Sequence, residues 1–150
     1  SFLVRSPTIE FNLRLYFVDA PETALTYAER VRLQAEHFGI TLDAALKVGA
    51  RARERTKELL DKPFVVHTRW AKAAGRARES RYYGIVMVGE KSLAELLVSE
   101  GLALVKGVYA KLPSGEKSAV HVKKLDALEK EARRKQLGGW TNATGKPALP

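Results

Sequence analysis

The stretch from Phe11 to Glu22 limits the fold of this chain more than any other part of the sequence. Apolar residues occupy every second position at its start, at Phe11, Leu13, Leu15 and Phe17. This spacing is typical of a β-strand with one buried face. The strand must end before Pro21, because proline has no amide hydrogen to donate to a neighbouring strand. The stretch therefore predicts a half-buried strand that leads directly into a turn with two carboxylates, Asp19 and Glu22.

Strand and helix patterns follow one another along the rest of the chain. Further strands are predicted at residues 2–4, 64–70, 81–88 and 102–106. Helices are predicted from a capping box at Thr26 to Gly39, from about Thr41 to Leu60, from a second capping box at Ser92 to Gly101, and from Ser118 to about Gln136. This order predicts an α+β fold in which helices pack against a small, strongly bent antiparallel sheet or barrel. One domain is expected over residues 1–140, with a loose polar tail over residues 141–150.

The chain is strongly basic for its length. Its 150 residues suit one domain with one core, and 26 Lys and Arg against 17 Asp and Glu give a formal net charge of +9. This charge favours an anionic partner, such as nucleic acid, a phosphorylated ligand or an acidic membrane surface, although it could also serve solubility alone. The absence of cysteine excludes disulfides, a thiol nucleophile and a thiolate zinc site. No apolar run approaches the ~20 residues of a membrane span.

The two carboxylates of the turn allow two interpretations. Aspartate and proline are ordinary turn residues, so Asp19, Pro21 and Glu22 can form a turn and nothing more. Alternatively, Asp19 can help to hold a calcium or magnesium ion, which prefers oxygen ligands, and Glu22 can act as a general base on water. The turn interpretation is favoured when the pair is considered alone.

Two arginines change that balance. Arg14 lies on the polar face of the first strand, and Arg81 begins a strand after a basic loop. Either one alone is most simply a surface arginine, but with two carboxylates they supply the groups that phosphoryl transfer needs: fixed cations, a metal ligand and a base. A fully extended chain would separate Arg14 from Asp19 by up to about 17 Å, so a shared site requires a bend after the strand. The three histidines are expected to be structural.

Three segments resemble the staphylococcal nuclease family, the thermonucleases. They are LRLYFVDAPET (residues 13–23), ARESRYYGIVMVGEKSLAELLVSEGLALV (residues 77–105) and a closing segment with a tyrosine, a basic helix and a tryptophan (residues 108–140). The resemblance implies a small five-stranded OB-type barrel with helices, a fold that often presents one face to nucleic acid. It also implies calcium-dependent hydrolysis of phosphodiester bonds in DNA and/or RNA, with cleavage of the 5′ P–O bond.

The same resemblance assigns roles to individual residues. The catalytic residues would be Arg14, Glu22 and Arg81, the calcium ligands Asp19 and the main-chain carbonyl of Ala20, and the substrate-binding residues Arg78 and Tyr109. A monomer without a protein partner or membrane contact is expected. A secreted or periplasmic location is also expected from the family, although no signal peptide is visible in a sequence that begins at Ser1.

The chain departs from the family pattern in three places. The family's Asp-Gly-Asp metal-binding segment would fall just before Ser1, and its Tyr-Gly before the second arginine is Glu79-Ser80 here. Residues 24–39 form a longer segment, which predicts an added helix that covers or shapes the cleft. These departures keep open a second function, an OB-fold nucleic-acid-binding module with weakened or lost catalysis. The complete set of Arg14, Glu22 and Arg81 favours the enzyme.

Overall fold

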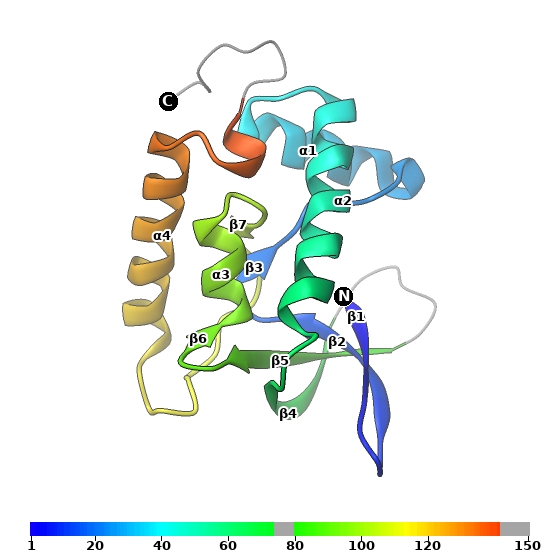
Figure 1. The fold of residues 1–150 in the computed structure, drawn as a ribbon, viewed down its shortest axis with the longest axis vertical. Helices are drawn as coiled ribbons and strands as arrows, with labels where there is room; N and C mark the ends of the chain where they lie inside the picture. The colour runs from blue at the N-terminus through cyan, green and yellow to red at the C-terminus, as the bar shows by residue number, and fades with distance from the viewer. Residues whose placement is uncertain (74–79, 142–150) are drawn as a thin grey trace.

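A curled five-stranded sheet forms one end of the molecule. The computed structural model describes residues 1–73 and 80–141 and confirms the α+β class, with a half-barrel of the OB type (Figure 1). The sheet has the order β1-β2-β5-β4, and β6 pairs with β5. Its strands are β1 (Phe2–Arg5), β2 (Glu10–Leu15), β4 (Val65–Ala73), β5 (Arg81–Val88) and β6 (Lys91–Ser92).

One pairing in this sheet differs from the predicted antiparallel arrangement. β2 and β5 are parallel, whereas β1–β2, β4–β5 and β5–β6 are antiparallel. Two helices and β4 lie between β2 and β5 in the chain, and this long connection allows the chain to return to the same end of the sheet. The parallel pair is the central one, and it positions the candidate site.

A bend in the chain ends β2 earlier than predicted. The alternating pattern continues to Phe17, but β2 stops at Leu15 and Phe17 adopts a positive φ of 73°. The chain then enters a second, two-stranded sheet, in which β3 (Val18–Asp19) pairs with β7 (Leu104–Val105). The predicted strand over residues 102–106 is therefore shorter than expected, because only two of its residues find a partner strand.

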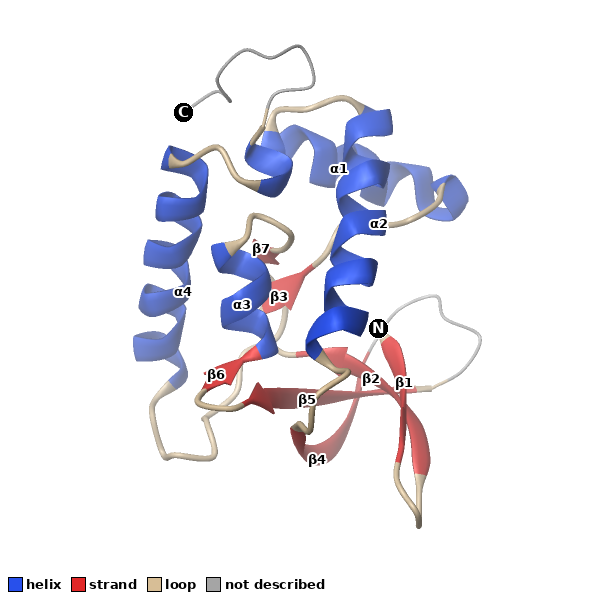
Figure 2. Ribbon diagram, viewed as in Figure 1, coloured by secondary structure: helices blue, strands red, loops and turns tan. Residues whose placement is uncertain are grey.

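Four α-helices of the described residues stand on one side of the sheet. Figure 2 shows α2, α3 and α4 above the sheet, and α3 packs against both of the others. They are α1 (Ala28–Phe38), α2 (Leu42–Leu59), α3 (Leu93–Ser99) and α4 (Ser118–Arg134), with short 3₁₀ helices η1 (Leu25–Tyr27) and η2 (Gly138–Trp140). The predicted added helix after the first motif is α1. Within the described residues, no helix is both long and apolar enough to cross a membrane.

Three of the four predicted helix starts, at Thr41, Ser92 and Ser118, are confirmed, and the one at Thr26 is wrong. The Thr41 hydroxyl accepts a hydrogen bond from the Ala44 amide, and the Ser92 hydroxyl accepts one from the Glu95 amide. Thr26, predicted to cap the first helix, lies inside η1 instead, and the cap position of α1 has no side-chain hydrogen bond. The 3₁₀ turn moves the start of α1 past Thr26, so its hydroxyl cannot reach the free amides of the first α-helical turn.

Two further predictions concern the ends of elements. β4 continues to Ala73 across an irregularity between Thr68 and Lys72, three residues past the predicted end of this strand at residue 70. Trp140 is buried against the Phe38 ring at 4.7 Å between centroids, as expected for an anchor after the last helix. Apart from Thr141, the predicted tail lies outside the described residues.

Candidate functional site

The bend after β2 brings the first arginine and the first carboxylate together. The Phe17 amide donates to the Val108 carbonyl (2.9 Å), and the Phe17 carbonyl accepts from the Lys106 amide (2.9 Å). These bonds fix the residue with positive φ, a conformation that is costly for a bulky side chain unless its surroundings hold it. As a result, Arg14 Nη2 lies 3.7 Å from Asp19 Oδ1. The bend that a shared site requires is therefore present.

The register of the parallel pair brings the second arginine to the same face. Asn12 is opposite Arg81, and Arg14 is opposite Tyr83. Arg14 is two residues beyond Asn12, so the Arg14 and Arg81 side chains leave the same face of the sheet. Arg81 Nη1 donates to the Ser1 hydroxyl at 3.1 Å. Burial, together with the positive charges of Arg14 and Arg81, lowers the pKa of the Ser1 amino group.

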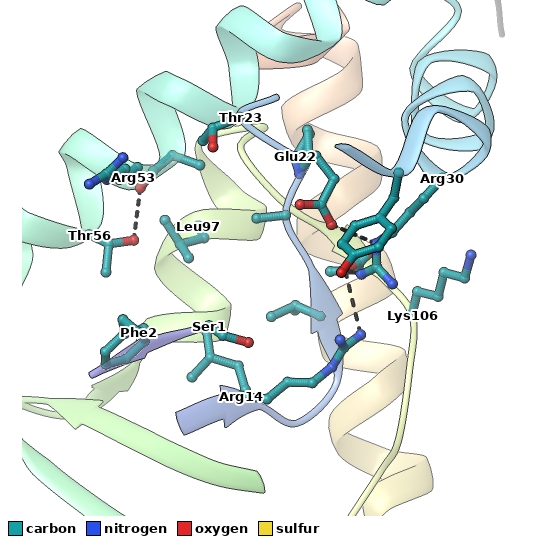
Figure 3. A pocket seen from close by; sticks show the side chains of 18 of the residues that line it. Ser1, Phe2, Arg14, Glu22, Thr23, Arg30, Arg53, Thr56, Leu97 and Lys106 are labelled. Atoms are coloured by element: carbon teal, nitrogen blue, oxygen red, sulfur yellow. Dashed lines mark hydrogen bonds and ion pairs between the residues drawn. The ribbon is translucent and has the colours of Figure 1, made fainter. Parts of the chain in front are cut away.

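Both arginines line an open cleft of about 1120 Å³. In Figure 3, Arg14 and Glu22 approach this cleft from opposite sides, and Lys106 and Arg30 border it. Basic side chains outnumber acidic ones along its walls: the basic ones are Arg14, Arg30, Arg53, Lys57, Arg81 and Lys106, and the acidic ones are Asp19, Glu22 and Glu29. A cleft with this balance of charge attracts polyanions.

Arg30 of α1 contacts both carboxylates of the turn. Its Nη2 pairs with Asp19 Oδ1, and its Nε lies 2.7 Å from Glu22 Oε1. The second contact is an ion pair without hydrogen-bond direction, since Nε has no hydrogen-bond partner. Asp19 is only 8% exposed, whereas the Glu22 side chain is 34% exposed. Both carboxylates line the cleft, and Glu22 is the more exposed of the two.

Gln34, one helical turn further along α1, ties the turn together. Its amide nitrogen donates to Asp19 Oδ2 (2.9 Å) and to the Ala20 carbonyl (3.3 Å). Its amide oxygen accepts from the Glu22 main-chain N–H (3.0 Å). Gln34 is 3% exposed, so these polar groups satisfy one another away from water. The turn from Asp19 to Glu22 is thus held by side chains of α1.

Arg30 and Gln34 were not predicted as site residues, although their spacing in the sequence contains a signal. Positions four apart on a helix share a face, and the spacing places both side chains on the side of α1 that packs inward near Val31 and Ala35. A buried glutamine and a half-buried arginine on such a face require polar partners. The partners could not be identified from spacing, because they lie in a turn whose position depends on how α1 docks.

Gly49 of α2 supports the same turn from the other side. A Cβ atom at this position would lie 2.3 Å from the Glu22 carbonyl oxygen and 2.6 Å from that of Pro21. Glycine inside a helix is about 1 kcal/mol less favourable than alanine. The close approach of the α2 backbone to the turn explains why glycine is nevertheless found here.

Of the two predicted substrate-binding residues, the structure describes only Tyr109, and it does not line the cleft. Arg78 lies outside the described residues. Tyr109 is 46% exposed and stacks on Phe17 at 5.5 Å between centroids, but it is not among the described residues that line the cleft. His121, expected to be structural, is buried with Nδ1 3.2 Å from Glu116 Oε1.

The predicted calcium ligands do not fit a metal ion in this arrangement. Asp19 and the Ala20 carbonyl do lie together, since one Gln34 amide group contacts both. However, N–H groups of Arg30 and Gln34 already bind the Asp19 carboxylate, and the described residues contain no group of three or more His, Asp or Glu side chains that could hold a metal. Calcium takes six to eight oxygen ligands in proteins.

Comparison with protein-family models gives a match over most of the chain. A family model described as staphylococcal nuclease homologue matches residues 12–142 of the 150. No protein with a curated description matches the chain. The matched range contains Arg14, the turn from Asp19 to Glu22, and Arg81.

Proposed function

The chain belongs to the staphylococcal nuclease homologue family, and we propose on that basis that it hydrolyses phosphodiester bonds of DNA or RNA in the cleft beside β2 and β5. The observation that carries the proposal is the convergence of Arg14, Arg81 and Glu22 on one basic cleft. Family membership supports a nuclease in general. The roles of the individual residues are our proposal.

Arg14 and Arg81 would bind the phosphate. A guanidinium offers two parallel N–H donors to two phosphate oxygens, and it stays charged at every physiological pH. Because the two side chains leave the same face of adjacent strands, they can approach one phosphate together. Fixed cations in this position stabilise the negative charge that grows on the phosphate as water attacks it.

Glu22 would orient or deprotonate the attacking water. Its side chain lines the cleft and is partly exposed, so both water and substrate can reach it. The new bond forms between the water oxygen and phosphorus, and the proton of the water passes to Glu22. The bond from phosphorus to the 5′ oxygen breaks, and this oxygen leaves with the electron pair and takes up a proton from solvent to give a 5′ hydroxyl and a 3′ phosphate. Arg78 and Tyr109 remain proposed contacts to the substrate.

Calcium has no assigned step in this proposal. The family is typically calcium-dependent, but the oxygens of Asp19 and Ala20 here accept hydrogen bonds from Arg30 and Gln34. Hydrogen-bond donors and a cation compete for the same lone pairs. Cleavage must therefore be measured both with calcium and with a chelator.

The test is cleavage of a supercoiled plasmid and of a single-stranded RNA by the purified chain. We expect Glu22→Gln to lose most of the cleavage while its circular dichroism and melting curve stay unchanged. Glu10→Gln is the matched control, because Glu10 is an exposed glutamate on β2 that does not line the cleft among the described residues. Cleavage by Glu22→Gln at the wild-type rate would contradict the proposed role.

One observation favours the second candidate, a binding module without catalysis. Arg30 contacts both carboxylates of the turn, so its guanidinium occupies an oxygen of Glu22 that a catalytic glutamate would offer to water. Such a module would bind a fluorescent oligonucleotide, with an affinity that falls steeply as salt rises, and would leave it intact for hours. Cleavage in the plasmid assay would exclude this alternative.

A further inference from the structure

We propose that Arg30 is the resident cation of the Asp19–Glu22 pair and stands where a divalent metal would otherwise bind. Arg30 would then be a positioning residue, which acts through Asp19 and Glu22. This inference rests on the proposed function, because it concerns how the same site is arranged to receive a phosphodiester. It differs from the expectation of a calcium site, and four observations support it.

The first observation is the bridging contact itself. One guanidinium reaches Asp19 Oδ1 through Nη2 and Glu22 Oε1 through Nε, the latter at 2.7 Å. A metal ion shared by two carboxylates would make the same kind of bridge. The Arg30 side chain is 37% exposed, so it lies at the wall of the cleft and is not locked into the core.

The second observation is charge balance. Asp19 and Glu22 carry two negative charges, and Arg30 and Arg14 carry two positive charges, with Arg14 Nη2 at 3.7 Å from Asp19 Oδ1. The pair is therefore neutralised by side chains alone. A calcium ion would add two further positive charges beside two guanidinium groups, which is unfavourable in a partly buried site.

The third observation is the orientation of the Gln34 amide. Its NH₂ group donates to Asp19 Oδ2 and to the Ala20 carbonyl, the two oxygens expected to bind calcium. The amide cannot be reversed, because its oxygen accepts from the Glu22 N–H at 3.0 Å, and reversal would place two donors against each other. Hydrogen atoms, and not lone pairs, therefore point at the predicted metal ligands.

The fourth observation is that α1 holds both residues in place. Arg30 and Gln34 are four positions apart, on the side of the helix that also carries Val31 and Phe38, which are fully buried. The Gly39 cap in the left-handed conformation ends the helix. Because the core fixes the helix, the cation is a permanent part of the site and not a surface side chain that happens to pair.

The direct test is a calorimetric titration with calcium chloride alone on metal-free protein. We expect the wild-type chain to bind calcium more weakly than about 1 mM, the weak end of protein calcium sites. Arg30→Ala removes the guanidinium that bridges both carboxylates, and we expect it to bind calcium about tenfold more tightly or better. Arg30→Lys, which keeps the charge, should remain weak. Arg32→Ala is the matched control, because Arg32 lies on the same helix but pairs with exposed Glu29 and Glu36.

A second variant covers the case in which Arg30→Ala fails to fold. Gln34→Glu replaces the amide donor by carboxylate oxygens beside Asp19 and Ala20, and we expect it to acquire calcium binding while its melting curve confirms a folded chain. A wild-type dissociation constant for calcium below about 1 mM would overturn the inference, and so would folded Arg30→Ala and Gln34→Glu variants that bind calcium no more tightly than the wild type. The wild-type titration decides the question even if both variants unfold.

Plasmid cleavage separates failure of this inference from failure of the proposed function. Equal wild-type cleavage with calcium and with chelator supports both. Cleavage that stops in chelator overturns the inference and leaves the nuclease intact. No cleavage under any condition, with the calcium titration as expected, contradicts the nuclease and still supports Arg30 as the resident cation.

Discussion

The two sides of the cleft are built in different ways. The arginine side is held by the main chain, because the register of β2 and β5 places Arg14 and Arg81 on one face of the sheet. The carboxylate side is held by side chains and close packing: Gln34 and Arg30 of α1 bind the turn, and Gly49 of α2 lets the helix approach it. The phosphate-binding half of the site is thus a property of the sheet. The position and the ion pairs of the two carboxylates depend on how α1 and α2 pack against the turn.

The largest effect is expected from the arginine side. We predict that Arg81→Ala lowers the single-turnover cleavage rate by about 100- to 1,000-fold, the effect typical of removing one group that stabilises transition-state charge. The fold should survive, because Arg81 begins its strand and is only partly buried. Cleavage rates on a fixed oligonucleotide and thermal melting by circular dichroism measure the two effects.

Arg69→Ala is the matched control for that variant. Arg69 is an exposed arginine on β4 and is not among the described residues of the cleft wall. We expect it to cleave at the wild-type rate. If Arg69→Ala and Arg81→Ala lose activity equally, the loss would come from the lower net positive charge of the protein and not from removal of a specific contact to the phosphate.

The next largest effect tests the packing of α2 against the turn. We predict that Gly49→Ala lowers the free energy of unfolding by about 3 kcal/mol, because overpacking costs 1–3 kcal/mol and here the new atom meets main-chain oxygens. Cleavage should fall as well, since the Glu22 main chain must move. Ala50→Ser, at the neighbouring exposed position, should change stability by less than about 0.5 kcal/mol. An unchanged urea midpoint for Gly49→Ala would show that the turn can shift away from the new methyl group at no cost in stability, so that α2 does not hold it.

Gln34→Leu tests the side-chain half of the same support. It removes the partner of Asp19 Oδ2, the Ala20 carbonyl and the Glu22 amide in one step. Leaving buried polar groups without partners costs about 1–3 kcal/mol, so we expect a loss of about 2 kcal/mol in urea unfolding. Gln136→Leu, at an exposed glutamine after α4, is the control and should melt like the wild type. Equal stability of Gln34→Leu and the wild type would contradict the role of this amide.

The arginine side could be predicted from sequence, and the carboxylate side only in part. Alternation at residues 11–17 and branching at residues 81–88 placed Arg14 and Arg81 at strand positions, and local patterns of this kind survive in the fold. The parallel pairing of β2 with β5 was missed, because strand partners are chosen by contacts distant in sequence. The bend at Phe17 was required by the hypothesis of a shared site, but its position was not visible in the residue types.

The carboxylate side shows why the rest was out of reach. Thr26 has the residue type and spacing of a helix cap, yet a 3₁₀ turn takes its place. Arg30 and Gln34 were visible only as polar residues within an amphipathic pattern. Their partners are defined by the docking of α1 on the turn, and spacing along one helix contains no information on the element that it will meet.

The smallest expected effect separates the stability of α2 from its contact with the turn. Thr41→Ala removes the hydroxyl that accepts from the Ala44 amide at the start of α2. Loss of such a cap costs about 1 kcal/mol, so we expect a lower urea midpoint with an unchanged cleavage rate below the unfolding transition. Ser92→Ala, which removes the equivalent cap of α3, should behave in the same way. A lower cleavage rate in Thr41→Ala, but not in Ser92→Ala, would mean that fraying of α2 at its first turn is transmitted along the helix to Gly49. In that case the position of the carboxylates would depend on the stability of the whole of α2. The position of the arginines would still depend only on the pairing of β2 with β5, so the two sides of the cleft would differ even more.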